Sequence, residues 1–399
     1  MKKKFIILFI FIITILTGCS NNKKVSNKDF EKLSIEEKVN YKMDNLSIDE
    51  KIAQILIVYY IGDEYDENLS NIIKEVKPGG FILMSDNITT YDRTLNFVKG
   101  MQNDSDIPMI ISTDEEGGSV QRIKGIRDIS VTDIPYMYYL GQTKDKNLAY
   151  KVGEIIANEL RTIGVNLTYA PVMDIYSNPN NTVIGKRSFG SDPNTVYDMA
   201  TSLKNGIEDN LVNTCIKHFP GHGDTETDSH FEIPIINKTL DELENSDLLP
   251  FIKSINDTNM IMVGHIALPK ITNSSIPASL SKEIVTDLLK NKYNYKGLVI
   301  TDALNMGSLT NNYSDKEIYT MAINAGVDLL LMPNGSKNAI KYIKEAIDDE
   351  EIDINTINES VRKILTYKYS NIKENYLDKS YLNKSEYSNV LNQIIINEN

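Results

Sequence analysis

The feature that most constrains the fold is a regular alternation of short apolar runs with segments of helical pattern. The apolar runs are rich in Ile, Leu and Val, and helical segments such as Leu148–Ile163 and Lys282–Lys292 separate them. The predicted strands are Ile55–Ile61, Gly80–Met84, Met109–Thr113, Asn166–Ala170, Asn213–His218, Met260–His265, Gly297–Thr301 and Val327–Met332.

These runs are almost continuously apolar, which is typical of strands buried on both faces of a parallel sheet. Eight strand–helix units predict an α/β fold, and specifically a single (β/α)8 barrel of the TIM type spanning residues 46–370. A doubly wound open sheet is the competing architecture, because periodicity alone does not prove that a sheet closes. Residues 371–399 are rich in Asn, Lys, Ser and Tyr, and they are too few for a second domain.

The N-terminus has the pattern of an export signal. Lys2, Lys3 and Lys4 precede the apolar run Phe5–Leu16, which is too short to span a bilayer comfortably. The run leads into Leu16-Thr17-Gly18-Cys19, which resembles a bacterial lipobox. We therefore expect residues 1–19 to be a lipoprotein signal, with Cys19 lipidated and the protein anchored at the extracellular face of the cell membrane. An ordinary signal peptide with an incidental Cys is the alternative.

Residues 20–45 are predicted to be a polar tether followed by a short helix. Ser34 with Glu37, and Ser47 with Glu50, have the spacing of a capping box, in which a Ser side chain and a Glu three residues later close the first turn of a helix. The helix that follows Ser47 would be the first of the predicted barrel.

Composition excludes several classes of protein. The formal net charge is −13, so the chain is a poor candidate for binding nucleic acid, which requires clustered Lys and Arg. Only two Cys are present, which excludes a disulfide framework and a Cys-rich metal site. If Cys19 is lipidated, Cys215 has no partner and is expected to be a small buried residue.

Ionisable residues lie at or after the C-terminal ends of five of the predicted strands. In a parallel barrel the C-terminal ends of the strands carry the catalytic groups, so these residues are expected to face one common mouth. They are Asp114, Asp174, Lys217 with His218, His265, and Asp302. Each of them alone has an equally good explanation as a helix cap or a structural ion pair.

The segment 217–230 holds three of the four His residues. His218 and His222 have a spacing that suits zinc only on a helix, and the intervening Pro220 and Gly221 prevent one, so no metal is predicted. Asp228 and His230 are separated by one residue, and in an extended loop the carboxylate can orient the imidazole for acid/base work. His222 is expected to hold the loop in place.

Several motifs together resemble glycoside hydrolase family 3, in its bacterial β-N-acetylglucosaminidase branch. They lie in order along most of the chain: Thr113–Gly118 with Arg122, Asn158–Arg161, Asn166–Asp174, Lys186–Gly190, Lys217–His230 and Ile300–Leu304. The resemblance implies a retaining mechanism, with Asp302 as nucleophile, His230 as general acid/base and Asp228 as its partner. It also implies that a terminal N-acetylglucosamine is bound by Asp114, Arg122, Arg187, Lys217 and His218, without a cofactor.

The same resemblance implies the substrate, a non-reducing N-acetylglucosamine on peptidoglycan fragments or related glycans. Some relatives use phosphate instead of water as the acceptor, and the sequence does not choose between hydrolysis and phosphorolysis. Two other classes of protein are alternatives. A solute-binding lipoprotein of a transporter shares the lipobox and the α/β alternation but gives no reason for Asp302 and the Asp228–His230 pair. A metal-dependent deacetylase or hydrolase would lose activity with a chelator.

Overall fold

The structure is a computed structural model, and it describes residues 27–225, 232–373 and 375–394. The predicted signal segment with Cys19, and the pair Asp228 and His230, lie outside the described residues. Within the described ranges, no helix combines the length and the apolar content needed to cross a membrane.

The strands of the fold are short, buried and mostly parallel. A six-stranded sheet has the order β11-β1-β2-β3-β6-β7, and a three-stranded sheet has the order β10-β9-β8. The strands are β1 (Leu56–Val58), β2 (Gly80–Ile82), β3 (Ile110–Thr113), β6 (Leu167–Thr168), β7 (Asn213–Thr214), β8 (Ile216–Phe219), β9 (Met260–Val263), β10 (Leu298–Thr301) and β11 (Leu330–Leu331). All eight predicted strand regions therefore contain a strand, and the prediction of an α/β fold is confirmed.

Strand order follows the chain, and the last strand, β11, lies beside the first, β1. The two sheets come close to each other at two places. Cys215 alone separates β7 from β8, and it is free and fully buried, as predicted. Ile300 of β10 forms a parallel bridge with Leu329, next to β11, and Thr301 N donates to Leu329 O at 3.1 Å.

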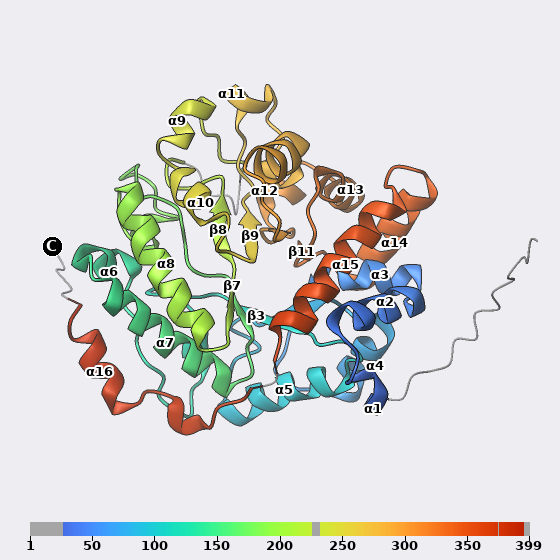
Figure 1. Cartoon of the computed structure of the whole chain (residues 1–399), viewed down its shortest axis with the longest axis horizontal. Coiled ribbons are helices and arrows are strands. Elements are labelled where there is room, and N and C mark those ends of the chain that lie inside the picture. The colour runs from blue at the N-terminus through green and yellow to red at the C-terminus, as the bar shows by residue number, and fades with distance from the viewer. Residues whose placement is uncertain (1–26, 226–231, 374, 395–399) are drawn as a thin grey trace, which may run out of the picture.

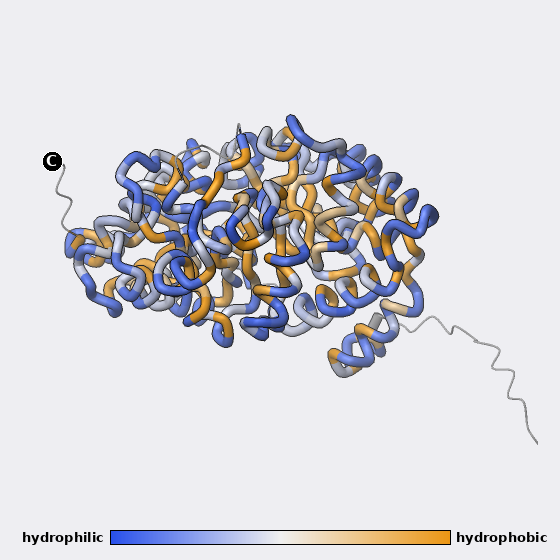
Figure 2. Tube along the Cα trace, turned by 90° about the horizontal axis from the view of Figure 1, so that it is seen from above, coloured by the Kyte–Doolittle hydropathy of each residue, from blue (hydrophilic) through white to orange (hydrophobic). Residues whose placement is uncertain are grey.

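Helices surround the strands (Figure 1). Hydrophobic segments lie mainly in the interior of the molecule, and hydrophilic segments lie mainly at its periphery (Figure 2). The α-helices are α1 (Asn27–Phe30), α2 (Ile35–Asn45), α3 (Ile48–Gln54), α4 (Glu67–Val76), α5 (Tyr91–Asp104), α6 (Met137–Thr143), α7 (Lys146–Thr162), α8 (Pro193–Asp209), α9 (Leu240–Glu244), α10 (Leu249–Ser254), α11 (Pro269–Thr272), α12 (Gly307–Thr310), α13 (Asp315–Ala325), α14 (Ser336–Asp348), α15 (Ile354–Asn371) and α16 (Ser385–Leu391).

Both predicted capping boxes are present. The Ser34 hydroxyl accepts from Glu37 N and the Glu37 carboxylate accepts from Ser34 N, which begins α2; Ser47 and Glu50 do the same for α3. The predicted helix Leu148–Ile163 corresponds to α7. The predicted helix Lys282–Lys292 forms wider π-type turns over Glu283–Lys292, labelled η4.

One β-hairpin consists of short polar strands, so the apolar runs of the sequence do not predict it. β4 (Glu115–Gly117) and β5 (Val120–Gln121) pair antiparallel directly after β3. Gly117 and Gly118 have φ values of +92° and +59°, which Gly adopts without the steric cost of a side chain. A short 3-10 helix, η1 (Arg122–Gly125), follows the hairpin, and this unit forms one wall of the site described below.

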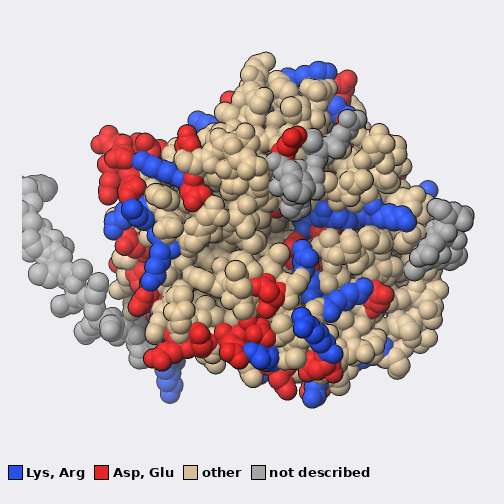
Figure 3. Space-filling model, turned by 180° about the vertical axis from the view of Figure 1, so that it is seen from behind, with Lys and Arg blue, Asp and Glu red and all other residues tan. Residues whose placement is uncertain are grey.

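Basic side chains lie beside acidic ones across the middle of one face of the molecule (Figure 3). The net charge of −13 therefore coexists with many ion pairs. The C-terminal residues pack on the body: η5 (Lys379–Tyr381) and α16 follow α15, and Leu382, Tyr387 and Ile394 are buried.

Candidate active site

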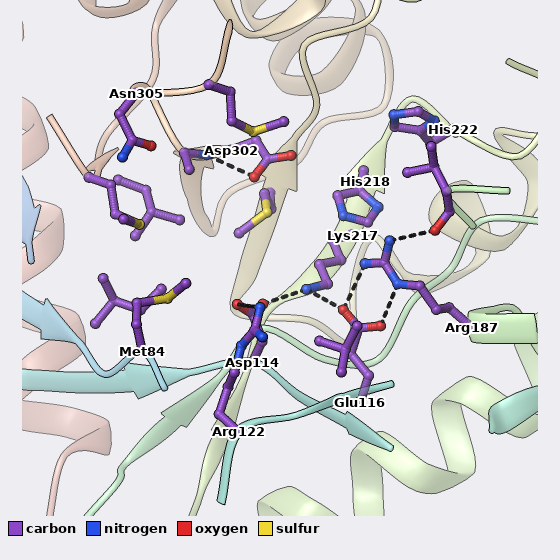
Figure 4. Close-up of a pocket in the computed structure, with 18 residues that line it drawn as sticks. Met84, Asp114, Glu116, Arg122, Arg187, Lys217, His218, His222, Asp302 and Asn305 are labelled. Atoms are coloured by element: carbon purple, nitrogen blue, oxygen red, sulfur yellow. Dashed lines mark hydrogen bonds and ion pairs between the residues drawn. The ribbon is translucent and has the colours of Figure 1, made fainter. Parts of the chain in front are cut away.

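A cavity of about 320 Å³ opens where the parallel strands end. Its walls combine charged side chains with methionines, as Figure 4 shows. The lining residues are Ile82, Met84, Asp114, Glu116, Val120, Arg122, Val183, Arg187, Lys217, His218, His222, Met262, Asp302, Ala303, Asn305, Met306, Leu331 and Met332. Six of the residues predicted from the sequence line it: Asp114, Arg122, Arg187, Lys217, His218 and Asp302.

A cluster of buried charges lies at one side of the cavity. Lys217 Nζ, from β8, lies 2.7 Å from Asp114 Oδ1 and 2.6 Å from Glu116 Oε1. Arg187, from the 3-10 helix η2 (Gly185–Arg187), donates Nε to Glu116 Oε2 and Nη2 to Glu116 Oε1, both at 2.8 Å. The two cations, Lys217 and Arg187, therefore contact the two carboxylates, Asp114 and Glu116. These opposite charges offset one another inside the protein.

Electrostatics keep Glu116 and Lys217 of this cluster ionised. Burial alone would raise the pKa of Glu116, but the charges and hydrogen bonds of Arg187 and Lys217 hold the pKa well below its usual range. Burial would lower the pKa of Lys217, and the carboxylates of Asp114 and Glu116 raise it instead. The cluster therefore offers charged donors and acceptors to a polar ligand at neutral pH.

Arg122 lies at the edge of the same cluster. Its Nη2 is 3.9 Å from Asp114 Oδ2, too far for a hydrogen bond. Its Nε is buried and has no hydrogen-bond partner among the described residues. A ligand in the cavity could accept hydrogen bonds from these donors.

Asp302 faces the cavity from the opposite side (Figure 4). It directly follows β10, its backbone N donates to Val263 O at 3.0 Å, and Ala303 N donates to its Oδ1 at 2.8 Å. Burial would raise the pKa of Asp302, but His218, His265, the Ala303 N–H and Lys217 together hold the pKa below its usual value. The side chain is therefore an ionised carboxylate, in a state that can act as a nucleophile.

Two further strand-end residues lie behind the cavity rather than in its lining. Asp174 is fully buried, and its Oδ2 lies 2.7 Å from His218 Nδ1, while its Oδ1 accepts from His222 N at 2.7 Å. His265 is also fully buried; its Nε2 lies 3.0 Å from Ala303 O and its Nδ1 lies 2.7 Å from Ser279 Oγ. These two residues orient side chains that line the cavity.

His222 has the structural role predicted for it, and its ring also lines the cavity. Its Nδ1 lies 2.8 Å from Thr225 Oγ1, and Asn181 donates to its backbone O at 2.8 Å. Burial, followed by the neighbouring His218 charge, lowers the pKa of His222 to about 4. The imidazole is therefore neutral at physiological pH.

Sequence reasoning did not select Glu116 or Asn305 as site residues. The signal for Glu116 was available: Glu115-Glu116-Gly117-Gly118 places carboxylates beside a Gly-Gly turn, directly after a buried strand. Within the described ranges, no group of three or more His, Cys, Asp or Glu side chains is arranged to hold a metal ion.

Comparisons with known proteins identify the class of this site. The pattern described as "Glycosyl hydrolase family 3 N terminal domain" matches residues 47–367. β-Hexosaminidase A of Pseudoalteromonas piscicida is 34% identical over 290 residues, which cover 68% of this chain and 48% of that protein. β-Hexosaminidase LpqI of Mycobacterium tuberculosis is 31% identical over 336 residues, which cover 82% of this chain and 84% of that protein.

A solved structure agrees with these relatives. The glycoside hydrolase family 3 β-N-acetylglucosaminidase of a Paenibacillus species superimposes with a TM-score of 0.82 at 30% identity, over 88% of this chain and 68% of that one. The matched part of the chain thus covers about half the length of the Pseudoalteromonas relative and most of the length of the Mycobacterium relative. The chain belongs to glycoside hydrolase family 3, and the prediction of a glycoside hydrolase is confirmed.

Proposed function

We propose that the protein is a retaining exo-β-N-acetylglucosaminidase. The observation that carries the proposal is the cavity in which the ionised Asp302 carboxylate faces the Lys217–Asp114–Glu116–Arg187 cluster. A carboxylate opposite charged donors suits a sugar ring, because the carboxylate can stabilise an oxocarbenium-like transition state while the donors hold the hydroxyl groups. The relatives whose names state β-hexosaminidase or β-N-acetylglucosaminidase activity support the choice of sugar.

The cavity volume favours cleavage from a chain end. About 320 Å³ lies at the lower end of the range for ligand sites, about 300–1,000 Å³, and suits one sugar unit. In the proposed complex the hydroxyl and acetamido groups of that unit are bound by Asp114, Arg122, Arg187, Lys217 and His218. The leaving group then lies outside the cavity, towards its mouth.

The proposed reaction has two steps. In the first, Asp302 attacks the anomeric carbon, the glycosidic C–O bond breaks, and His230 donates a proton to the departing oxygen. In the second, His230 takes a proton from water, the water oxygen bonds to the anomeric carbon, and the bond to Asp302 breaks. Asp228 orients the His230 ring in both steps. The assignments of Asp228 and His230 rest on the sequence motif, since both residues lie outside the described ranges.

Activity with a chromogenic N-acetyl-β-glucosaminide tests the proposal. We expect release of the chromophore and of free N-acetylglucosamine with retained β-configuration at the moment of cleavage, unaffected by a chelator. A sugar phosphate formed when phosphate is added would identify a phosphorylase instead. Loss of activity with the chelator would point to a metal-dependent hydrolase, and absence of turnover would contradict the proposal.

We further propose that the substrate is N-acetylglucosamine at the non-reducing end of peptidoglycan fragments and that the enzyme works at the outer face of the membrane. The lipobox-like Leu16–Cys19 segment after a basic and apolar leader supports this location. Cys19→Ala should leave the protein unprocessed or unanchored. If the unmodified protein stays in the membrane fraction with an N-terminus that is cleaved but carries no lipid, the proposed lipid anchor is contradicted.

The architecture is also proposed in its finer form, a closed eight-stranded barrel over residues 46–370. Closure is supported by the sequential strand order and by the pairing of β11 with β1. It is also supported where the two sheets meet, by the single residue between β7 and β8 and by the Ile300–Leu329 bridge. Closure would bring the strand ends into one ring and fix the height of Asp302 relative to Lys217.

A further inference from the structure

Glu159 of α7 is a buried carboxylate outside the cavity. Only 2% of its surface is exposed, and its side chain joins two distant segments of the chain. Its Oε1 accepts from Thr132 N at 3.0 Å, from Thr132 Oγ1 at 2.6 Å and from Asn383 N at 2.7 Å, and its Oε2 accepts from Thr132 N at 3.2 Å. Four contacts on one buried carboxylate define its position and that of both segments.

Thr132 belongs to a segment that supports the back of the β4–β5 hairpin. Gln121 Nε2 donates to Thr132 O at 2.8 Å, and Gln121 Oε1 accepts from Ile134 N at 3.2 Å. Gly118 N donates to Ile134 O at 2.8 Å, and a side chain at Gly117 would meet Pro135 O at 2.7 Å. The hairpin therefore rests closely on residues 132–135.

The front of the same hairpin faces the cavity. Asp114 precedes it, Glu116 lies within β4 and Arg122 follows it directly, and all three side chains line the cavity. Arg122 N also donates to Asp114 O at 3.3 Å, which joins the two ends of the hairpin. A shift of the hairpin would move three of the charged groups that line the cavity.

Asn383 belongs to the C-terminal segment, defined here as residues 375–394. Arg161 Nε donates to Asn375 O at 3.1 Å, and Leu377 N donates to Arg161 O at 3.2 Å. Leu382 and Tyr387 are buried, and α16 lies beside α7 (Figure 1). The segment is thus held along α7 at several points, and its Asn383 N–H is one of the donors that fix Glu159.

We propose that Glu159 is a positioning residue for the sugar-binding hairpin, and that the C-terminal segment helps to hold it in place. The order of contacts is Asn383, Glu159, Thr132 and then Gln121, which belongs to β5 of the hairpin. This inference rests on the proposed function only for its kinetic test, because the contacts themselves do not depend on the substrate.

Glu159→Gln, with Glu154→Gln on the same helix as the matched control, tests the role. The amide keeps the volume but replaces one acceptor oxygen by a donor NH₂. We expect the KM for a chromogenic N-acetyl-β-glucosaminide to rise about 2- to 30-fold, a typical range for coupling through a packed network, while kcat changes less. A purely structural role would lower the melting temperature and leave the KM of the folded enzyme unchanged, which would overturn the proposal.

Hydrogen exchange gives a readout that needs no substrate. In Glu159→Gln the amides of Gly118 and Ile134 should exchange faster than in the unmodified protein and in Glu154→Gln, at a temperature where all three are folded. Unchanged exchange would overturn the proposal. If the unmodified protein does not cleave N-acetylglucosaminides, the proposed function fails, while the exchange result still decides the role of Glu159.

A second variant tests the C-terminal segment without altering Glu159. Leu382→Ala loosens the packing of that segment on α7, and we expect the same changes in KM and in amide exchange, smaller in size. If Glu159→Gln alters both readouts and Leu382→Ala alters neither, the role assigned to the C-terminal segment is wrong. If Glu159→Gln does not fold, Leu382→Ala alone decides the proposal by the same two readouts.

Discussion

Glu116 Oε1 lies 2.6 Å from Lys217 Nζ and 2.8 Å from Arg187 Nη2, so a single carboxylate oxygen joins two cations that line the cavity. Lys217 belongs to β8 and Arg187 to η2, and their like charges would repel without the carboxylate between them. Glu116 therefore sets the spacing of two groups proposed to bind the sugar.

Replacing Glu116 by Gln should destabilise the protein strongly. Removing one partner of a buried ionic cluster leaves uncompensated charge, at a cost of about 3–5 kcal/mol. We expect the free energy of unfolding in urea to fall by that amount and the KM of the folded fraction to rise. Glu386→Gln, at an exposed site in the C-terminal segment, should change the stability by less than about 0.5 kcal/mol. A Glu116→Gln variant as stable as this control would contradict the cluster's role.

Glu115, next to this cluster, should make stability fall as the pH rises. Burial, with a further contribution from the Glu159 charge, raises its pKa from 4.5 to about 8. Between these values the folded state holds a proton that the unfolded state has lost, so this contribution is complete below pH 4.5 and disappears as the pH passes 8. From this group the free energy of unfolding falls by at most about 1.4 kcal/mol per pH unit. Urea unfolding from pH 5 to 9 should show a flatter profile for Glu115→Gln, and identical profiles would refute the prediction.

His265 should affect turnover more than binding. Its Nε2 lies 3.0 Å from Ala303 O, and Ala303 N donates to Asp302 Oδ1, so the ring fixes the turn that orients the carboxylate. We expect His265→Gln to lower kcat by about tenfold or more, because misplacement of a reacting group by about 1 Å can cost 10²-fold. Ser279→Ala, which loses only the contact with His265 Nδ1, should have a smaller effect. Equal KM and kcat values for His265→Gln and the unmodified enzyme would exclude this role.

His230 should matter most for poor leaving groups. Acid/base assistance contributes about 10²–10⁴-fold, and a leaving oxygen of high pKa needs the proton most. We expect turnover of a natural disaccharide by His230→Gly to fall by that factor. For an activated aryl glycoside, the first step should slow much less. Near-normal turnover of the disaccharide would exclude His230 and leave His222 as the next candidate, although its lowered pKa argues against that role.

Patterns that repeat along the chain were the most reliable guide to the fold. Buried parallel strands must be apolar on both faces, so each strand region was visible as an apolar run, and the Ser–x–x–Glu spacing located the starts of α2 and α3. The β4–β5 hairpin was missed because its strands are short and polar and owe their pairing to Gly117 and Gly118.

The candidate site was predictable only where a residue lies at the C-terminal end of a strand or directly after it. Asp114, Lys217, His218 and Asp302 were found this way. The sequence could not distinguish residues that line the cavity from those behind it, because that difference depends on tertiary contacts: Asp174 and His265 are fully buried partners of lining groups. Arg122 and Arg187 were identified only through the family resemblance, since neither follows a predicted strand.

The most direct test of the account is covalent trapping of the nucleophile. We propose to treat the enzyme with a slow fluorinated N-acetylglucosaminide and to map the adduct by mass spectrometry of peptides. We expect one adduct, on Asp302, together with a loss of turnover of several orders of magnitude in a folded Asp302→Ala variant. An adduct on Asp114 or Asp174, or an Asp302→Ala variant that turns over at nearly the unmodified rate, would contradict it.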